Sequence, residues 1–286
     1  MGIGTRFSAA LCVALALGSA PVGAEGTSTD RVERPGTVQQ LLALTHLEPL
    51  VHVVATEGAR HGLSLEGALF PGKGGSAWAS AVSRIQAPDR IVPIIHGAVT
   101  ELMGPEDVTA ANAFFGSELG QRVVNSEVSA RRKMLDKTVE AEAMGAAAML
   151  VRADNPRMTL IEDIIDALDL VSANVSGGLN ANYAFYRGLA EGGAMARRLA
   201  EQEMLAMVLN QEADIRKATE EWLRAYLTMA YAPLSDGELH AYVDFVQTRA
   251  GRRYNAAMFA GFGRVFEATS YDLGLAAARF MVAEDI

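Results

Sequence analysis

"EDVTAANAFFGSELGQRV", residues 106–123, is followed 131 positions later by "GELHAYVDFVQTRAGRRY", residues 237–254. Four aligned positions are identical, namely Ala110 with Ala241, Phe114 with Phe245, Gly120 with Gly251 and Arg122 with Arg253. Helical segments come in the same order around both stretches. Similarity at a fixed period is typical of a repeated structural unit, and the sequence therefore predicts an internal duplication.

Each stretch has the pattern of one helix ending and the next beginning. The shared motif is Phe114, Ser117 and Gly120 in the first copy and Phe245, Thr248 and Gly251 in the second. We expect the phenylalanine to be a core anchor and the hydroxyl residue to be the N-cap of the following helix. The glycine falls at the third position of that helix, where a missing side chain lets another helix approach closely.

From residue 37 onward the helical period dominates the chain, and strand-like alternation is hard to find. We predict an all-α bundle of about eight main helices, arranged as two tandem pseudo-symmetric four-helix repeats. The repeats are residues 37–152 and 158–286, with a linker at 153–157. The expected helical segments are 37–62, 77–103, 105–116 and 118–151, then 159–189, 195–232, 236–247 and 249–282. We expect the halves to pack as one body; two independent units are the alternative.

Several helix starts have sequence signals of their own. Capping boxes are predicted at Thr37 with Gln40, Thr159 with Glu162 and Ser235 with Glu238. Gly104 followed by Pro105 predicts another start, with proline in the first helical position.

The N-terminus is typical of an export signal. Arg6 is the only charged residue in positions 1–24, an apolar run follows it, and Ala24 ends a small-residue cleavage pattern. The run is shorter than the about 20 apolar residues that span a bilayer, so we expect a cleaved signal rather than an anchor. Residues 25–36 are polar and predicted to be a disordered leader. We expect a periplasmic protein with no transmembrane segment after signal removal.

Composition excludes several kinds of chemistry. Cys12, the only cysteine, lies in the predicted signal, so the mature chain would have neither disulfides nor thiolate sites. The net charge of −9 argues against nucleic acid as a partner. The densest basic run, residues 130–133, is flanked by Glu127 and Asp136 and is expected to be a solvated helix face.

The repeated motif resembles the signature of the bacterial periplasmic family called domain of unknown function 2059. The first copy matches it with Asp107, Val108, Phe114, Phe115, Ser117 and Gly120 but has Glu118 where the family usually has proline. The second copy keeps Glu238, Leu239, Phe245 and Gly251 and departs from it at Val246, Thr248 and Arg249. "TVQQLLALTHLEPLV", residues 37–51, looks like the family's opening helix. The resemblance implies an exported helical domain and no catalytic residues.

Motifs for catalysis are missing from the sequence. None of the five histidines belongs to an H-E-x-x-H pattern, and neither G-x-S-x-G nor S-x-x-K occurs. Residues 72–76, "GKGGS", fail the phosphate-loop pattern because Gly74 follows Lys73. We therefore predict no catalytic residues and no cofactor.

Two groups of residues are candidates for binding. Glu162, Asp166 and Asp169 recur at helical spacing and could hold a divalent cation, although a solvated acidic face is the alternative. Tyr183, Phe185 and Tyr186 follow Gly177-Gly178, which could kink or end a helix and leave an aromatic groove. A structural helix corner is the alternative there.

The sequence favours a non-catalytic periplasmic accessory protein that binds an envelope protein or an apolar small ligand between its helices. The alternatives are a hydrolase-type enzyme with a dispersed site and a divalent-cation-binding protein.

Overall fold

The computed structural model of the chain describes residues 37–195 and 201–282, and every regular element in these residues is an α-helix. The all-α prediction is confirmed. The predicted signal at 1–24 and leader at 25–36 lie outside the described residues. Before residue 153 the helices are α1 (Val38–Leu44), α2 (Leu47–Leu69), α3 (Gly75–Ile85), α4 (Pro88–Leu102), α5 (Pro105–Phe115), α6 (Glu118–Lys133) and α7 (Lys137–Arg152). After it come α8 (Pro156–Ala167), α9 (Leu170–Glu191), α10 (Glu201–Leu209), α11 (Glu212–Tyr231), α12 (Asp236–Val246) and α13 (Arg249–Val282).

The helices are more numerous than the eight expected because five of the expected segments are divided. The second segment, 77–103, is interrupted at residues 86–87, between α3 and α4. The first and fifth segments each turn at a residue with positive φ, His46 at 47° and Asp169 at 49°. A left-handed residue ends one helix and redirects the chain into the next. The fourth segment is interrupted at residues 134–136, between α6 and α7, and the sixth between α10 and α11. The eighth segment stays whole as α13.

Most predicted helix starts are present. The hydroxyl of Thr37 accepts a hydrogen bond from the backbone N–H of Gln40 at 3.0 Å, and Ser235 forms a complete capping box with Glu238. The start predicted at Thr159 is wrong: α8 begins at Pro156, and the Asn155 side chain caps it. Proline is favoured in the first helical position, which places the start three residues earlier.

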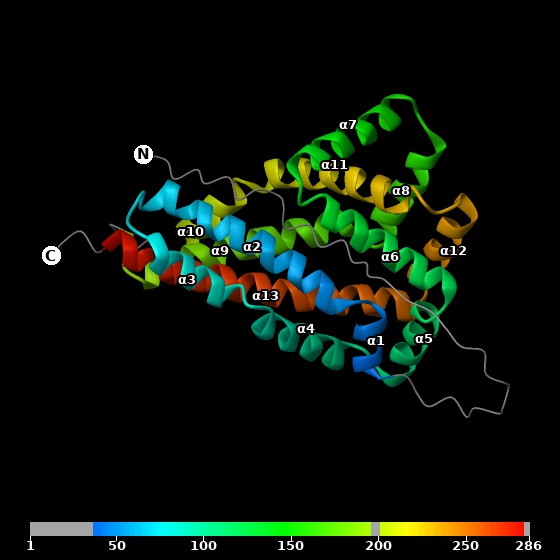
Figure 1. Ribbon diagram of the computed structural model, residues 1–286, viewed down its shortest axis with the longest axis horizontal. Helices are drawn as coiled ribbons and strands as arrows, with labels where there is room; N and C mark the ends of the chain where they lie inside the picture. The colour runs from blue at the N-terminus through cyan, green and yellow to red at the C-terminus, as the bar shows by residue number, and fades with distance from the viewer. Residues whose placement is uncertain (1–36, 196–200, 283–286) are drawn as a thin grey trace.

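Helix α13 runs along the middle of the elongated body (Figure 1), where it packs mainly against α9 and α4. Helices α5 and α12 close one end, and α2, α3, α9 and α10 surround the other end of α13. Helix α7 lies at the edge, against α11 and α8. The C-terminal helix is therefore the element around which helices from both halves are organised.

The buried apolar side chains form two clusters, and each cluster combines residues from before and after the predicted linker. The larger one extends from Leu41 to Phe266, and the smaller one includes Phe70 and Trp78 together with Phe185 and Leu273. Burial of this apolar surface is the main source of folding free energy, and both halves contribute to it together.

The α9–α13 crossing depends on glycine. A Cβ atom on Gly188 would collide with the carbonyl oxygen of Tyr271, and one on Gly274 would collide with that of Phe185. The two backbones therefore approach as closely as helices do when small residues meet. None of the helices in the described residues has the length and apolar character needed to cross a membrane.

Candidate functional site

The predicted aromatic residues of α9 are mostly part of the core. Helix α9 continues through Gly177 and Gly178 without an end. Phe185 and Tyr186 are buried in the smaller cluster, whereas half-buried Tyr183 donates a hydrogen bond to the Glu201 carboxylate at 2.9 Å. Burial raises the pKa of the Tyr186 phenol. These side chains therefore pack the fold rather than line one surface groove together.

The predicted acidic stripe is divided by the chain. Helix α8 ends at Ala167, and Asp169 follows in the left-handed conformation, so only Glu162 and Asp166 share a helix. Glu162 is 2.5 Å from the Arg224 guanidinium, with which it forms an ion pair. In residues 37–195 and 201–282 no group of three or more His, Cys, Asp or Glu is arranged to hold a metal ion.

The repeated motif has the same local geometry in both copies. The Ser117 hydroxyl accepts from the Gly120 N–H at 3.0 Å, and the Thr248 hydroxyl accepts from the Gly251 N–H at 3.0 Å. A Cβ on either glycine would collide with the carbonyl of the phenylalanine six residues before it. The glycine is needed because the end of the preceding helix lies against it.

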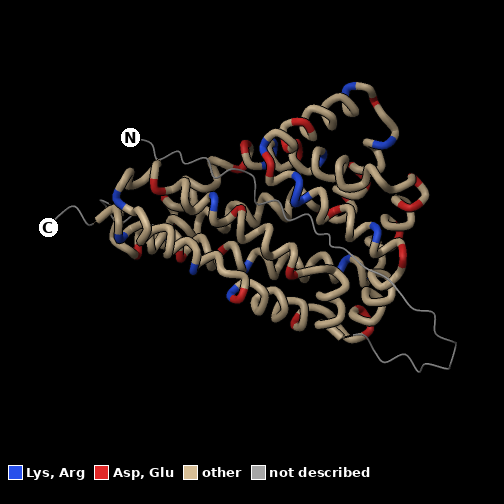
Figure 2. Tube along the Cα trace, in the orientation of Figure 1, with Lys and Arg blue, Asp and Glu red and all other residues tan. Residues whose placement is uncertain are grey.

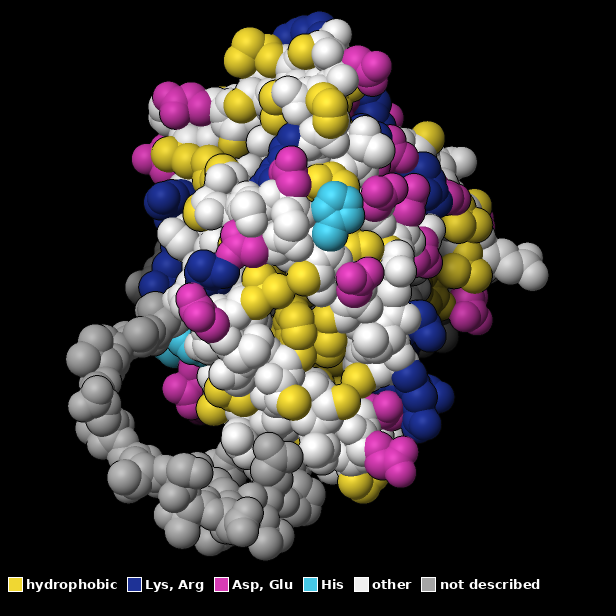
Figure 3. Space-filling view, turned by 90° about the vertical axis from the view of Figure 1, so that its right-hand side faces the viewer, with side chains coloured by type: hydrophobic (Ala, Val, Ile, Leu, Met, Phe, Trp, Pro, Cys, Tyr) yellow, Lys and Arg dark blue, Asp and Glu magenta, His cyan; other side chains and the backbone are white. Residues whose placement is uncertain are grey.

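Phe114 and Phe245 contact each other directly. Their rings stack with centroids 3.7 Å apart and planes 2° apart. Phe115 and Tyr254 extend the same aromatic group into the core. Figure 3, which views the end carrying α5 and α12, shows hydrophobic side chains gathered in the middle of this face. The two motifs therefore meet, and the two phenylalanines expected to anchor the core pack against each other.

A surface groove lies between α1, the start of α2, and α4, at residues where no binding site was predicted. Its volume is about 680 Å³. The floor is apolar, because Leu42 and Leu47 are buried there. Exposed Glu48 and His96 are among its polar residues. The complete lining is Gln39, Leu42, Ala43, His46, Leu47, Glu48, Pro49, Val92 and His96.

The groove has the composition of a binding pocket. Such pockets are mostly apolar, have a few polar groups that fix orientation, and occupy about 300–1,000 Å³. The left-handed turn at His46 positions the imidazole between α1 and α2, and α4 supplies the second imidazole. The sequence did not predict the groove, because residues 37–62 were expected to form one helical segment without the break at His46.

A second polar site is buried between α6 and α11. The guanidinium of Arg131 forms an ion pair with Glu57 at 2.5 Å and lies over the Trp222 ring, 4.7 Å from its centroid. The Trp222 indole N–H donates to the Glu140 carboxylate of α7 at 3.2 Å. Arg131 is 3% exposed, so the expectation that residues 130–133 form a solvated face is wrong for this arginine. The helix turns its Arg131 side inward against α11.

Glu127, one turn before Arg131, is also buried and is 1% exposed. Tyr231 donates its hydroxyl to Oε1 of Glu127, and Tyr226 donates to the Glu127 carbonyl at 3.1 Å. Oε2 is buried and has no hydrogen-bond partner. Burial raises the pKa of the Glu127 carboxyl well above its ordinary value, and the Tyr231 hydrogen bond opposes this only in part. The folded protein therefore favours the neutral carboxyl.

The phenols of Tyr231, Tyr242 and Tyr254 also face a small cavity. Its volume is about 30 Å³, and its apolar lining includes Leu168 and Phe245. Burial raises the pKa of each of these tyrosines, so all three remain neutral at physiological pH. Room for a water begins at roughly 10–15 Å³, so the space suits solvent rather than a large ligand.

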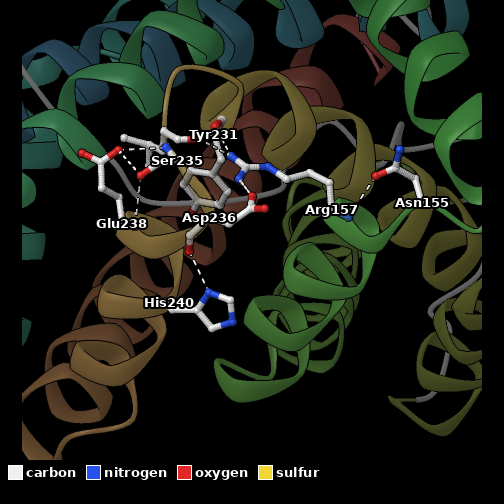
Figure 4. A network of polar contacts seen from close by, with 8 residues as sticks. Asn155, Arg157, Tyr231, Ser235, Asp236, Glu238 and His240 are labelled. Atoms are coloured by element: carbon white, nitrogen blue, oxygen red, sulfur yellow. Dashed lines mark hydrogen bonds and ion pairs between the residues drawn. The ribbon is translucent and has the colours of Figure 1, made fainter.

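A third polar network fixes the start of α12 (Figure 4). Arg157, in the first turn of α8, donates to the carbonyls of Tyr231 and Leu234 at 2.6 Å each and pairs with Asp236. One guanidinium thus satisfies carbonyl groups at the end of α11 and ties α8 to α12.

Ser235, Asp236 and His240 are residue types of a hydrolytic triad, but their contacts are those of a helix cap. The Ser235 hydroxyl donates to the Glu238 carboxylate at 2.8 Å and accepts from the Glu238 N–H. Nδ1 of His240 lies 2.7 Å from the backbone carbonyl oxygen of Asp236 (Figure 4). No hydrogen bond joins Ser235 to His240, so this group does not activate the serine as a nucleophile.

Charged residues of both signs are interspersed along the helices (Figure 2). The comparisons with known proteins add no relative: no family model matches the chain, and no curated protein and no solved structure is significantly similar to it. The fold and the site thus define an all-helical protein with an open apolar groove and a closed polar cluster. Its resemblance to domain of unknown function 2059 stays a prediction.

Proposed function

We propose that this is an exported, non-catalytic accessory protein that binds an apolar small ligand, or an apolar segment of an envelope protein, in the groove between α1, α2 and α4. The observation that carries the proposal is the groove itself, with its apolar floor of Leu42 and Leu47 and its polar residues Glu48 and His96. Among the apolar lining residues, Ala43 is exposed and Pro49 and Val92 are half-buried, and apolar surface left open in a folded protein commonly marks a binding site.

Export rests on the sequence. The charged, apolar and small-residue regions of residues 1–24 support a periplasmic location. The resemblance to domain of unknown function 2059 supports the same location. The lack of a cysteine after residue 24 is compatible with any redox environment.

We further propose that residues 37–152 and 158–286 are diverged copies of one unit. Left-handed residues join the first two helices of each half, His46 between α1 and α2 and Asp169 between α8 and α9, which supports this proposal. The packing between the halves also supports this proposal. Helix α4 of the first half packs on α13 of the second, and α11 of the second half packs on α6 and α7 of the first. Two ion pairs cross between the halves, Arg122 with Glu238 and Arg249 with Asp107; the two acids align at the 131-residue offset, whereas the two arginines do not.

The groove proposal is tested with the mature protein purified from the periplasm. Native mass spectrometry, before and after gentle denaturation, identifies any bound molecule by its mass, and a fluorescent apolar probe measures occupancy. We expect Val92→Glu to abolish probe binding because it places a charge in the groove. Val151→Glu on α7 is the matched control, since Val151 is exposed and far from the groove lining.

Equal probe binding by the wild-type protein and the Val92→Glu variant would contradict the proposal. So would a wild-type protein that carries no adduct, binds no probe and cross-links to no envelope protein.

A further inference from the structure

The two interfaces of the proposed duplication place opposite chemistry at equivalent positions. Glu127 and Arg131 on α6 face α11. The residues 131 positions later are Met258 and Phe262 on α13, where the chain faces α4. All four side chains are buried, at 3% exposure or less. At these aligned positions, the α6–α11 interface is polar and the α13–α4 interface is apolar.

The facing helices differ in the same way. Trp222 and Tyr226 of α11 contact the polar pair, whereas Ile91 and Ile95 stand at the corresponding positions of α4. Ile91 and Ile95 are fully buried in the larger core cluster. In one of the two proposed copies, at the α13–α4 interface, apolar side chains alone therefore hold the two helices together at these positions.

A buried ion pair is a costly way to hold two helices together. Removing two charges from water costs several kcal/mol per ion, and apolar replacements are often neutral or stabilising. Because the α13–α4 interface shows that apolar residues fit, packing does not explain why Arg131 and Glu57 are there. Charges retained in a core at such a cost are candidates for a functional site.

Burial has the largest effect on the Glu57 carboxyl and raises its pKa, although the charged groups around it are mostly positive. Three cationic side chains act on it, those of Arg131, Lys137 and Arg60, against one further carboxylate, that of Glu140. Counting Glu57 itself, three positive groups meet two negative ones, in a chain whose net charge is −9. An arginine guanidinium presents a planar fork of donors that matches a carboxylate.

Helix α7 covers this site, and its packing suits opening away from the rest of the fold. Its two buried residues are small, Ala143 and Ala147. Met144 and Leu150 pack half-buried against the core, and Met149 is 61% exposed. A three-residue interruption at 134–136 joins it to α6, whereas the corresponding positions of α13 lie inside a continuous helix. A helix with little buried apolar area opens more readily than one in the core.

We propose that Arg131, Glu57 and Trp222 form a closed binding site for a small carboxylate, with α7 as its cover. The ligand carboxylate takes the place of Glu57 beside the Arg131 guanidinium, which stays stacked on Trp222. This site is separate from the groove between α1, α2 and α4, and it does not depend on the function proposed there.

The test uses benzoate as the probe anion and benzyl alcohol as its neutral counterpart, titrated into the mature protein and followed by NMR. In Glu57→Gln the competing carboxylate is gone, so benzoate should bind at least about tenfold more tightly than to the wild type. Glu101→Gln is the matched control, because it removes the partner of Arg264 in an exposed ion pair. It should leave benzoate binding unchanged.

Two further results decide the proposal. Arg131→Leu should bind no benzoate, and benzoate should slow hydrogen exchange of the α7 amides in Glu57→Gln. The proposal is overturned if Glu57→Gln and Glu101→Gln bind benzoate equally, or if benzyl alcohol binds Glu57→Gln as well as benzoate does. It is also overturned if α7 exchange does not respond to bound benzoate. The Glu57→Gln comparison holds even where Arg131→Leu does not fold.

Discussion

The corner of α1, α2 and α4 and the corner of α8, α9 and α11 are built alike, but only the first is open. In both, a left-handed residue is followed by a buried leucine, Leu47 in one and Leu170 in the other. On the facing helix, His96 is exposed, whereas Leu227, 131 residues later, is 1% exposed. The first corner thus has a groove, and the second has a small cavity.

The difference teaches that side chains and covering helices decide where a site is available. Helix α7 turns away from α6 and packs on α11, while α13 continues straight past the corresponding point. One half therefore has a covered polar interface, and the other has an uncovered apolar corner. Both candidate sites arise where the halves depart from each other.

The largest expected effect comes from the charged interface. Arg131→Met leaves the half-buried Glu57 without its partner, so we expect it to lower the free energy of unfolding by about 3 kcal/mol. Urea denaturation measures this. The double variant Arg131→Met with Glu57→Met should recover most of the loss, because it makes the interface resemble α13 against α4.

A double variant as unstable as the single one would break the equivalence of the two interfaces. It would mean that the ion pair holds α6 against α11 in a way that apolar side chains do not reproduce.

The second prediction exchanges residues between the two corners. Leu227→His buries an imidazole in the closed corner and should destabilise the protein by about 2 kcal/mol or more. His96→Leu makes the opposite change at an exposed position and should alter stability by less than about 0.5 kcal/mol. Thermal unfolding of both variants measures the difference, and equal effects would show that the corners are not open and closed as described.

The third prediction concerns pH and the carboxyl of Glu127. Its folded pKa is raised above the ordinary value of 4.5 by burial, so the folded state binds more protons than the unfolded state above that pH. The stabilisation is complete below about pH 4.5 and is lost as pH rises toward the folded pKa. Burial also raises the pKa of Glu57, so that group adds a change of the same sign.

Glu127→Gln should therefore flatten the decrease of the unfolding free energy between pH 5 and pH 8, measured by denaturation across that range. Met258→Gln, at the corresponding place in the apolar interface, has no carboxyl to remove and should leave the pH dependence unchanged. An unaltered slope in Glu127→Gln would mean that this carboxyl does not titrate differently in the folded state.

The sequence predicts features whose contacts are local in the chain and misses those formed by tertiary packing. The caps at Thr37 and Ser235 were predictable because all their atoms lie within four residues. The groove was not, since residues 39–49 and 92–96 meet only through tertiary packing. Arg131 was misassigned because one basic residue in a charged run looks the same whether its helix face turns inward or outward.

The smallest expected effect tests the repeated motif directly. Ser117→Ala and Thr248→Ala each remove the hydroxyl that accepts the N–H of the glycine three residues later. Losing such an N-cap costs about 1 kcal/mol, and the matched geometry predicts nearly equal losses, measurable as shifts in the urea midpoint. Gly120→Ala and Gly251→Ala should cost more than the caps do, because the added Cβ meets backbone that has no room to move. A large loss at one copy and none at the other would mean that the two junctions share a sequence pattern but not a structural role.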